Sequence, residues 1–284
     1  MSEIPFSQAE TNDRDRTKNS IYFVEGDNFF TRCMVDYFIA RGWNSQFILV
    51  EADANIDDIS LSYPNPHHDN CEKAYFTDCQ LRAYEGDTTI NRIEEGSVIA
   101  NLPLNTRWQL NSWIDRLSLL SIDFREKYLY RIVYFYVSNG SYRSIKQFLM
   151  QLDKYPMDKL YQCLVFDTSC FSNADNLEYL EEYQPLMQII KTYQVPVLAF
   201  PKLNSAWQFE CEEKNLSYRK LGAGKSIAIQ QEITDFSERL DLLYGQIFPS
   251  TINDPQGLMK IAEAQKDYSN LKKAFFGENT TVLL

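Results

Sequence analysis

The sequence has no uninterrupted apolar run near the roughly 18 residues that a membrane-spanning helix requires. Residues 1–19 also lack the apolar core of a signal peptide and predict a flexible leader. The six cysteines stand at irregular spacings, which argues for reduced thiols rather than a disulfide framework. Together these absences predict a cytoplasmic protein without a membrane span.

Positive charge is scarce, because 28 Lys and Arg stand against 39 Asp and Glu, for a formal net charge of −11. Such a surface repels phosphate backbones on average, and no run of basic residues offsets it. Direct nonspecific binding of nucleic acid is therefore not expected. The 44% hydrophobic content is enough for a large core, and we expect one folded domain over residues 20–284.

Histidine is nearly absent, with only His67 and His68, adjacent in a polar segment. They offer little choice of general base, and no G-x-S-x-G elbow is present. Cys71 and Cys79 complete the only cluster of metal-ligand residue types, but its spacing matches no structural zinc pattern. We expect no catalytic residue, no bound metal and no cofactor.

Short apolar runs alternate with longer segments of helical period, which predicts βα units and an α/β fold with a mostly parallel sheet flanked by helices. Segment 52–95 is polar and irregular, and we expect a long surface excursion there. Trp113 lies on an apolar helical stripe and should be buried, whereas Trp108 should be exposed. The expected strands are 20–24, 47–51, 98–101, 130–137, 160–167 and 195–200, and the expected helices are 29–41, 108–117, 141–152, 176–193, 227–248 and 256–275.

The order of these segments resembles the ParA/MinD group of P-loop ATPases, particularly the MobD-like mobilisation proteins, over most of the chain. In that family a strand, a Gly-rich loop with Lys and Ser or Thr, and a helix ending in an Arg-Gly turn follow one another. Here IYFVEGDN precedes FFTRCMVDYFIARGW. Four later segments resemble the strands and turns that follow in the family: VEADAN, VIANLPLNT, YFYVSNGSYRSIKQF and VLAFPKLN. The resemblance implies a three-layer P-loop NTPase-like fold with C-terminal helices. Its vestigial nucleotide pocket would comprise Gly26, Asp27, Asn28, Asp53, Asn101 and Pro201.

The phosphate-binding motif of that family is missing. A P-loop needs several glycines and backbone amides, a Lys for the phosphates and a Ser or Thr for magnesium. Only residues 25–28 separate the first strand from its helix, and two of them, Glu25 and Asp27, carry carboxylates at a place meant for anions. Asn101 stands where the family has a magnesium-facing Asp. We expect Asp27 and Asn28 to cap the first helix instead.

A second glycine-rich stretch, 222–226 (GAGKS), looks like a phosphate loop in the wrong context. The full motif requires a glycine where Arg219 stands and a strand where a polar segment stands. We expect a loop that leads into a helix beginning near Ile227.

The sequence therefore favours a catalytically inactive, ParA/MinD-like pseudo-ATPase. It would act as an interaction or scaffolding module, with a protein partner or as a self-dimer, in plasmid mobilisation, partition or a related positioning system. Two alternatives stay open. One is a nucleotide-binding switch with a noncanonical site that uses Asp53 or Lys225. The other is an unrelated doubly wound enzyme with its site at the carboxyl ends of the strands.

Overall fold

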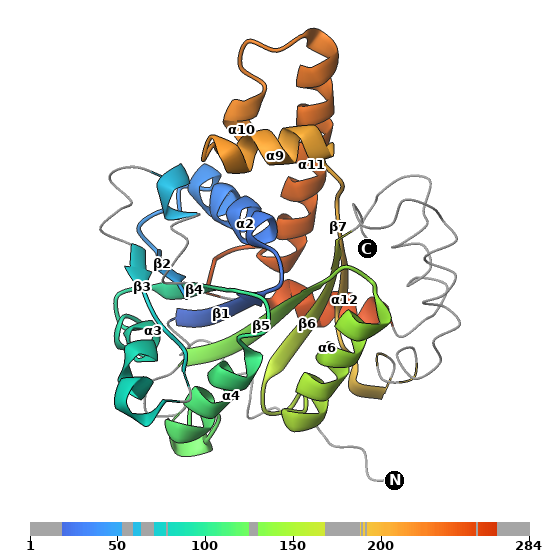
Figure 1. Cartoon of the computed structure of the whole chain (residues 1–284). Helices are drawn as coiled ribbons and strands as arrows, with labels where there is room; N and C mark the ends of the chain where they lie inside the picture. The colour runs from blue at the N-terminus through green and yellow to red at the C-terminus, as the bar shows by residue number, and fades with distance from the viewer. Residues whose placement is uncertain are drawn as a thin grey trace.

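The computed structural model describes residues 19–52, 59–63, 71–77, 79–124, 130–167, 188, 190, 192–253 and 255–265. At its centre lies a seven-stranded, all-parallel sheet in the order β3-β2-β4-β1-β5-β6-β7 (Figure 1). The predicted α/β class is confirmed. The strands are β1 (Asn19–Glu25), β2 (Phe47–Glu51), β3 (Cys71–Lys73), β4 (Ser97–Leu102), β5 (Tyr130–Ser138), β6 (Tyr161–Asp167) and β7 (Val197–Phe200).

Helices cover both faces of the sheet, which makes three layers (Figure 1). Because side chains alternate along a strand, Tyr22 and Val24 of β1 join the core on one face, while Ile21 and Phe23 join the core on the other. The first face carries α2 (Asn28–Ala40), α11 (Ile227–Ile247) and α12 (Gln256–Ala264), and the second carries α4 (Arg107–Arg116) and α6 (Tyr142–Lys154).

The central strands are buried on both faces, and this explains why they read as nearly continuous apolar runs. Trp113 is 2% exposed and Trp108 is 57% exposed, so the prediction for both tryptophans is confirmed. None of the helices within the described ranges combines the length and apolarity needed to cross a bilayer.

Segment 52–95 contains more regular structure than its composition indicates. Where it is described, it contributes the edge strand β3 and the short helices η1 (Ser60–Ser62), η3 (Gln80–Gly86) and α3 (Thr88–Asn91). The strand has the sequence CEK, and its pairing with β2 in parallel register makes it a strand. Such a short polar strand has no periodicity to detect.

Two helices between β7 and α11 were not predicted, α9 (Ser205–Glu213) and α10 (Tyr218–Leu221). Both are capped locally, by the side chains of Asn204 and Ser217. The predicted helix 176–193 falls mostly outside the described residues, as does the end of the predicted helix 256–275.

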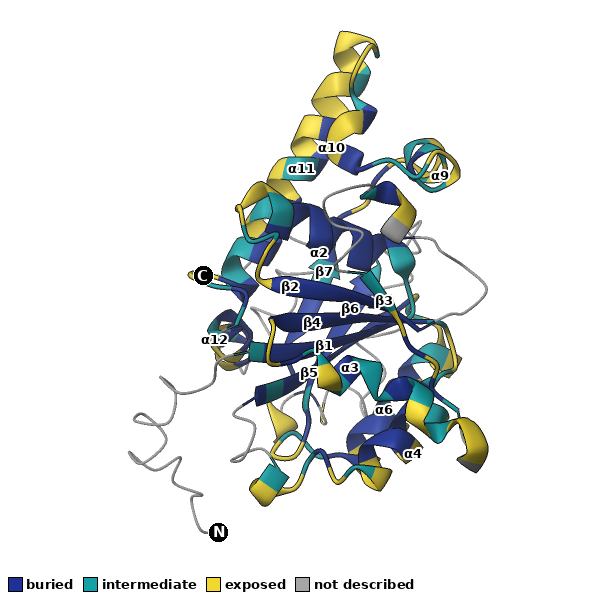
Figure 2. Ribbon diagram, turned by 90° about the vertical axis from the view of Figure 1, so that its left-hand side faces the viewer, coloured by how far each residue is buried: buried dark blue, intermediate teal, exposed yellow. Residues whose placement is uncertain are grey.

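An arm rises from the layered body, formed by α9, α10 and the beginning of α11, residues 205–232. Figure 2 shows its outer part mostly exposed. Lower down, α11 buries Phe236, Leu240 and Tyr244 in the core that also contains α2. The base of the arm belongs to the same core, because Cys211 of α9 and Tyr218 of α10 are buried there.

Candidate functional site

The turn between β1 and α2 is the place where the resemblance locates a phosphate loop, and it contains two residues. β1 ends at Glu25 and α2 begins at Asn28, so only Gly26 and Asp27 lie between them. Gly26 has a φ of +119°, and a Cβ atom there would lie 2.3 Å from the carbonyl oxygen of Val137 in β5. The turn thus packs directly against the neighbouring strand, and glycine is the residue that fits.

Asp27 caps α2, as predicted, whereas Asn28, also expected to cap it, is the first residue of the helix, and its Oδ1 accepts a hydrogen bond from Asn101 Nδ2 at 3.0 Å. The Oδ1 of Asp27 accepts a hydrogen bond from the backbone N–H of Phe29 at 2.7 Å. Burial raises the pKa of this carboxyl to about 6, and the carboxylates of Asp167 and Glu212 add to the rise, while the Phe29 N–H opposes it. The start of α2 is where a helix would bind a phosphate. In this chain a carboxylate of the protein itself occupies that position.

Replacing Asp27 with asparagine should stabilise the protein at pH 8 and leave it unchanged near pH 4. Asparagine caps helices as well as aspartate does but carries no charge. Because the folded-state pKa is raised, the stability of the wild type is lost as pH rises through 6, so the gain at pH 8 should be about 1–3 kcal/mol. Urea unfolding at both pH values measures it. Asp158→Asn, an exposed carboxyl, is the matched control, and an equal gain there would contradict the explanation.

Asn101 lies at the centre of a buried hydrogen-bond network at the carboxyl ends of β2, β4 and β1. Its Nδ2 donates to Glu51 Oε2 and to Asn28 Oδ1, each at 3.0 Å, so both amide hydrogens are used. Its Oδ1 accepts the hydroxyl of Thr31 at 2.9 Å. Glu51 is 1% exposed, and its other oxygen accepts the N–H of Ile59 at 3.2 Å. Both amide hydrogens and the oxygen of Asn101 therefore have partners within this buried network.

Thr31 was not singled out from the sequence. It follows two phenylalanines within α2, away from any glycine or lysine that would mark it as part of a phosphate loop. The signal that could have found it is its position in the first turn of the helix after β1, facing the end of β4.

Glu25 does not share the turn with Asp27, contrary to the expectation of two carboxylates at one place. It is the last residue of β1, and its side chain lies on the opposite face of the sheet. There its oxygens accept hydrogen bonds from the hydroxyl of Tyr134 and, at 3.2 Å, from the N–H of Asn105. Burial raises the pKa of the Glu25 carboxyl, and the nearby Arg107 and these hydrogen bonds oppose the rise. The chain turns at Gly26, with its φ of +119°, between the end of β1 and the cap of α2, and this turn separates the two acids.

The other predicted pocket residues divide into two groups. Pro201 is buried directly after β7, whose last residue, Phe200, packs against Phe29 and Phe30 of α2 with ring centroids 6.1 and 5.2 Å apart. This places the end of β7 beside the start of α2. Asp53 lies outside the described residues.

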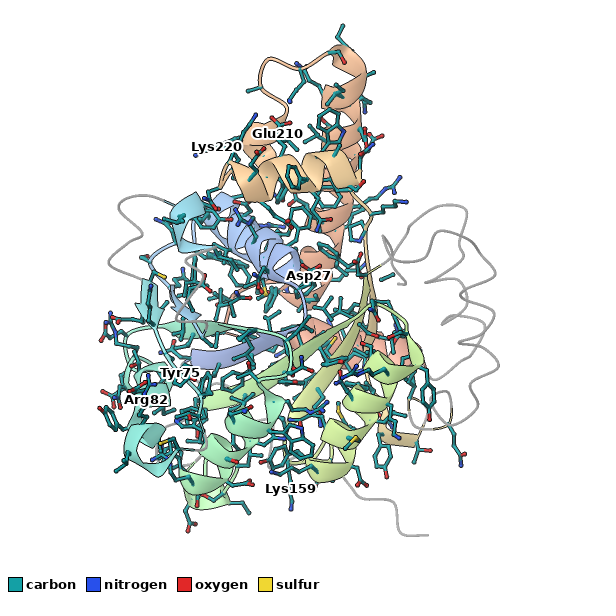
Figure 3. All side chains as sticks on the ribbon, viewed as in Figure 1. Asp27, Tyr75, Arg82, Lys159, Glu210 and Lys220 are labelled. Carbon is teal, nitrogen blue, oxygen red and sulfur yellow. The ribbon has the colours of Figure 1, made fainter. Side chains whose placement is uncertain are left out.

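Lys225 of the GAGKS stretch is tied to the arm. Its ammonium donates to Glu210 at 2.6 Å and lies 4.9 Å from the centre of the Trp207 ring, both on α9. Figure 3 shows Glu210 on the arm, and Asp27 at the start of α2. The stretch is a loop that leads into α11 at Ile227, as predicted.

The structure describes only part of the cluster of potential metal-ligand residues that the sequence contains. Cys71 lies in β3 and Cys79 is exposed, while His67 and His68 fall outside the described residues. In the parts of the chain that the structure describes, no group of three His, Cys, Asp or Glu side chains could hold a metal ion.

At this site Asp27 caps α2, and the Asn101 side-chain amide is hydrogen-bonded to protein groups. The turn between β1 and α2 is too short to surround a phosphate group. Its polar groups hold β1, β2, β4 and α2 together. A scan against protein-family models finds no match to this chain, and a search of curated proteins finds no significant match either.

Proposed function

We propose that this protein is a catalytically inactive, ParA/MinD-like pseudo-ATPase that works in the cytoplasm as an interaction or scaffolding module, in mobilisation, partition or a related positioning system. The observation that carries the proposal is the buried polar network in which the Asn101 side chain is hydrogen-bonded to Thr31, Asn28 and Glu51. It stands at the end of the strand next to β1, where the resemblance expects a magnesium-facing carboxylate.

Loss of magnesium chemistry is supported by how Thr31 and Asn101 meet. In P-loop ATPases a Ser or Thr hydroxyl and a carboxylate hold the magnesium ion between them and the phosphates. Here the Thr31 hydroxyl donates directly to the Asn101 amide. The pair is neutral and satisfied without a cation, and a neutral amide is a weak magnesium ligand.

Loss of phosphate binding is supported by Asp27. Nucleotide phosphates would have to approach the start of α2, where the Asp27 carboxylate already accepts the Phe29 N–H. Asp167 and Glu212 act electrostatically on the same carboxylate, so the surrounding charge is negative. A triphosphate would meet repulsion where it needs donors.

The alternative that uses Lys225 as a phosphate ligand finds no support in its contacts. Its ammonium is bound by Glu210 and covers an indole ring. Freeing it would break a charged hydrogen bond before any phosphate could be bound.

Calorimetric titration of the purified chain with magnesium-ATP tests the proposal. We expect no saturable heat up to about 1 mM ligand, which bounds any binding free energy below about 4 kcal/mol. Saturable binding would refute the pseudo-ATPase assignment. Asp53→Ala and Lys225→Ala would then be titrated in parallel, and the variant that loses the heat would locate the noncanonical site.

A further inference from the structure

Exposed apolar and basic side chains gather on the segment before α4, the first turn of α4 and the outer face of α6, on the side of the sheet opposite to α2. We infer that this surface binds an acidic segment of a partner protein that also carries apolar side chains. The inference rests on the proposed function as an interaction module. The rim patch, as we name it, comprises Leu104, Trp108, Tyr142, Arg143, Lys146 and Met150.

The two halves of the rim patch lie side by side. The guanidinium of Arg107 lies 5.6 Å from the centre of the Trp108 ring and donates to the carbonyl oxygen of Gln147 in α6. The side chain of Gln147 in turn donates to Asn105 Oδ1 at 3.4 Å, next to Leu104. Arg143 and Met150 lie one helical turn before and after Gln147, and Lys146 directly precedes it.

The apolar members of the rim patch are unusually exposed for their size. Leu104 and Tyr142 are each 63% exposed, Trp108 is 57% exposed and Met150 is 44% exposed. Single exposed apolar residues need no explanation, but a contiguous group of them marks an interaction site. Trp, Tyr, Met and Arg are also the residue types enriched at protein interfaces.

The rim patch is locally positive on a protein with a net charge of −11. Arg143 and Lys146 are exposed, and neither α4 nor α6 has an acidic residue in its first turn. The positive ends of both helix dipoles lie at this surface, and the buried Glu25 carboxylate, which accepts the N–H of Asn105 just before α4, offsets part of the charge there. The acidic residues further along the two helices are Asp115, which pairs with Lys154 at 2.9 Å, and Asp153.

The number of charges favours a protein partner over a membrane or a nucleic acid. Recognition of anionic lipid by a polybasic surface takes clusters of about four to eight Lys and Arg residues. Tight binding to DNA needs a comparable number of phosphate contacts. Two exposed cations beside an indole and a phenol suit an acidic segment with apolar anchors, in which burial supplies the affinity and charge supplies the orientation.

Fluorescence anisotropy with a synthetic peptide tests the inference on the full chain. The probe is a fluorescein-labelled peptide of about 18 residues with Glu and Leu at helical spacing, and the same peptide with Lys in place of Glu is the control probe. We expect saturable binding of the Glu peptide only. The double variant Arg143→Glu with Lys146→Glu, and separately Trp108→Ala, should each weaken it at least about tenfold.

Matched variants elsewhere on the chain separate a specific surface from general charge. Lys159→Glu with Lys220→Glu makes the same change in net charge at exposed positions outside the rim patch, one after the C-terminal end of α6 and one on α10 (Figure 3), and Phe209→Ala removes an exposed aromatic ring from the arm. Both should bind the peptide within about twofold of the wild type. Equal weakening in the matched variants, or no binding by the wild type, would overturn the inference.

Two further measurements test whether the rim patch binds a membrane or a second copy of this chain instead. Binding to phosphatidylserine vesicles that the double variant abolishes, without binding of the peptide, would replace the partner protein with a membrane. Concentration-dependent self-association in sedimentation that Trp108→Ala abolishes would replace it with a second copy. None of these outcomes bears on magnesium-ATP titration, so the inference and the proposed function fail separately.

Discussion

Replacing Gly26 with alanine should destabilise the protein by about 3–5 kcal/mol. The new Cβ would lie 2.3 Å from the carbonyl oxygen of Val137 and 3.2 Å from its carbon. Both atoms belong to the backbone of β5, the neighbour of β1 at the centre of the sheet, and cannot rotate away. The φ of +119° adds strain because L-residues rarely adopt it.

Gly42→Ala is the matched control for this prediction. Gly42 also has a positive φ, of +75°, but no heavy atom lies within 4 Å of its would-be Cβ. It should therefore show only the conformational cost, about 1 kcal/mol. Urea unfolding of both variants measures the difference. Equal losses would mean that the turn between β1 and α2 can move away from β5, and that the site is less closed than we describe.

Replacing Asn101 with aspartate should cost about 2–4 kcal/mol at pH 8. The substitution places a second carboxylate about one hydrogen-bond length from Glu51, since Asn101 Nδ2 lies 3.0 Å from Glu51 Oε2. It also removes the donor that Asn28 accepts from. Like charges at that distance in a buried site repel strongly.

The loss of stability in Asn101→Asp should depend on pH, because proton binding and folding are linked. Two adjacent buried carboxyls retain a proton in the folded state that the unfolded chain has already released, so the folded-state pKa is raised. The destabilisation should therefore be small near pH 4, grow as pH rises and be complete by pH 8. Asn139→Asp, the same change in an exposed turn, should stay within about 0.5 kcal/mol of the wild type at every pH.

The stability of Asn101→Asp in the presence of magnesium also tests the proposed function. If the pseudo-ATPase proposal holds, magnesium chloride should not restore the stability of Asn101→Asp, because Mg²⁺ keeps several waters or phosphate oxygens as ligands, while Glu51 and Asn101 are only 1% and 4% exposed. A magnesium-dependent recovery in thermal unfolding would contradict this expectation. It would indicate that Thr31 and the introduced carboxylate can hold a cation together, and that one substitution separates this site from a metal-binding one.

The sequence predicted the central strands and most of the long helices because each carries its own local signal. The runs that became β1, β2 and β5 are continuously apolar, as strands buried on both faces must be. The cap of α2 by Asp27 was also predicted, since capping depends on residues within one helical turn.

The elements that the sequence did not predict depend on contacts with distant residues. α10 has four residues and is too short to form alone. It forms where Tyr218 is buried against Phe236 of α11 and its N–H donates to Asp36 of α2 at 3.2 Å. β3 likewise becomes a strand because the edge of β2 is available to it.

For the candidate site, the sequence by itself determined which groups are present: a turn with one glycine, a carboxylate at the start of α2, and an amide at the end of β4. Only the tertiary structure decided which of these groups lie within hydrogen-bond distance of one another. Parallel pairing brings Asn101 level with Val24 of β1 and Glu51 of β2, far apart in the chain. Hydrogen bonds and repulsion act over a few ångströms, and only the folded sheet sets those distances.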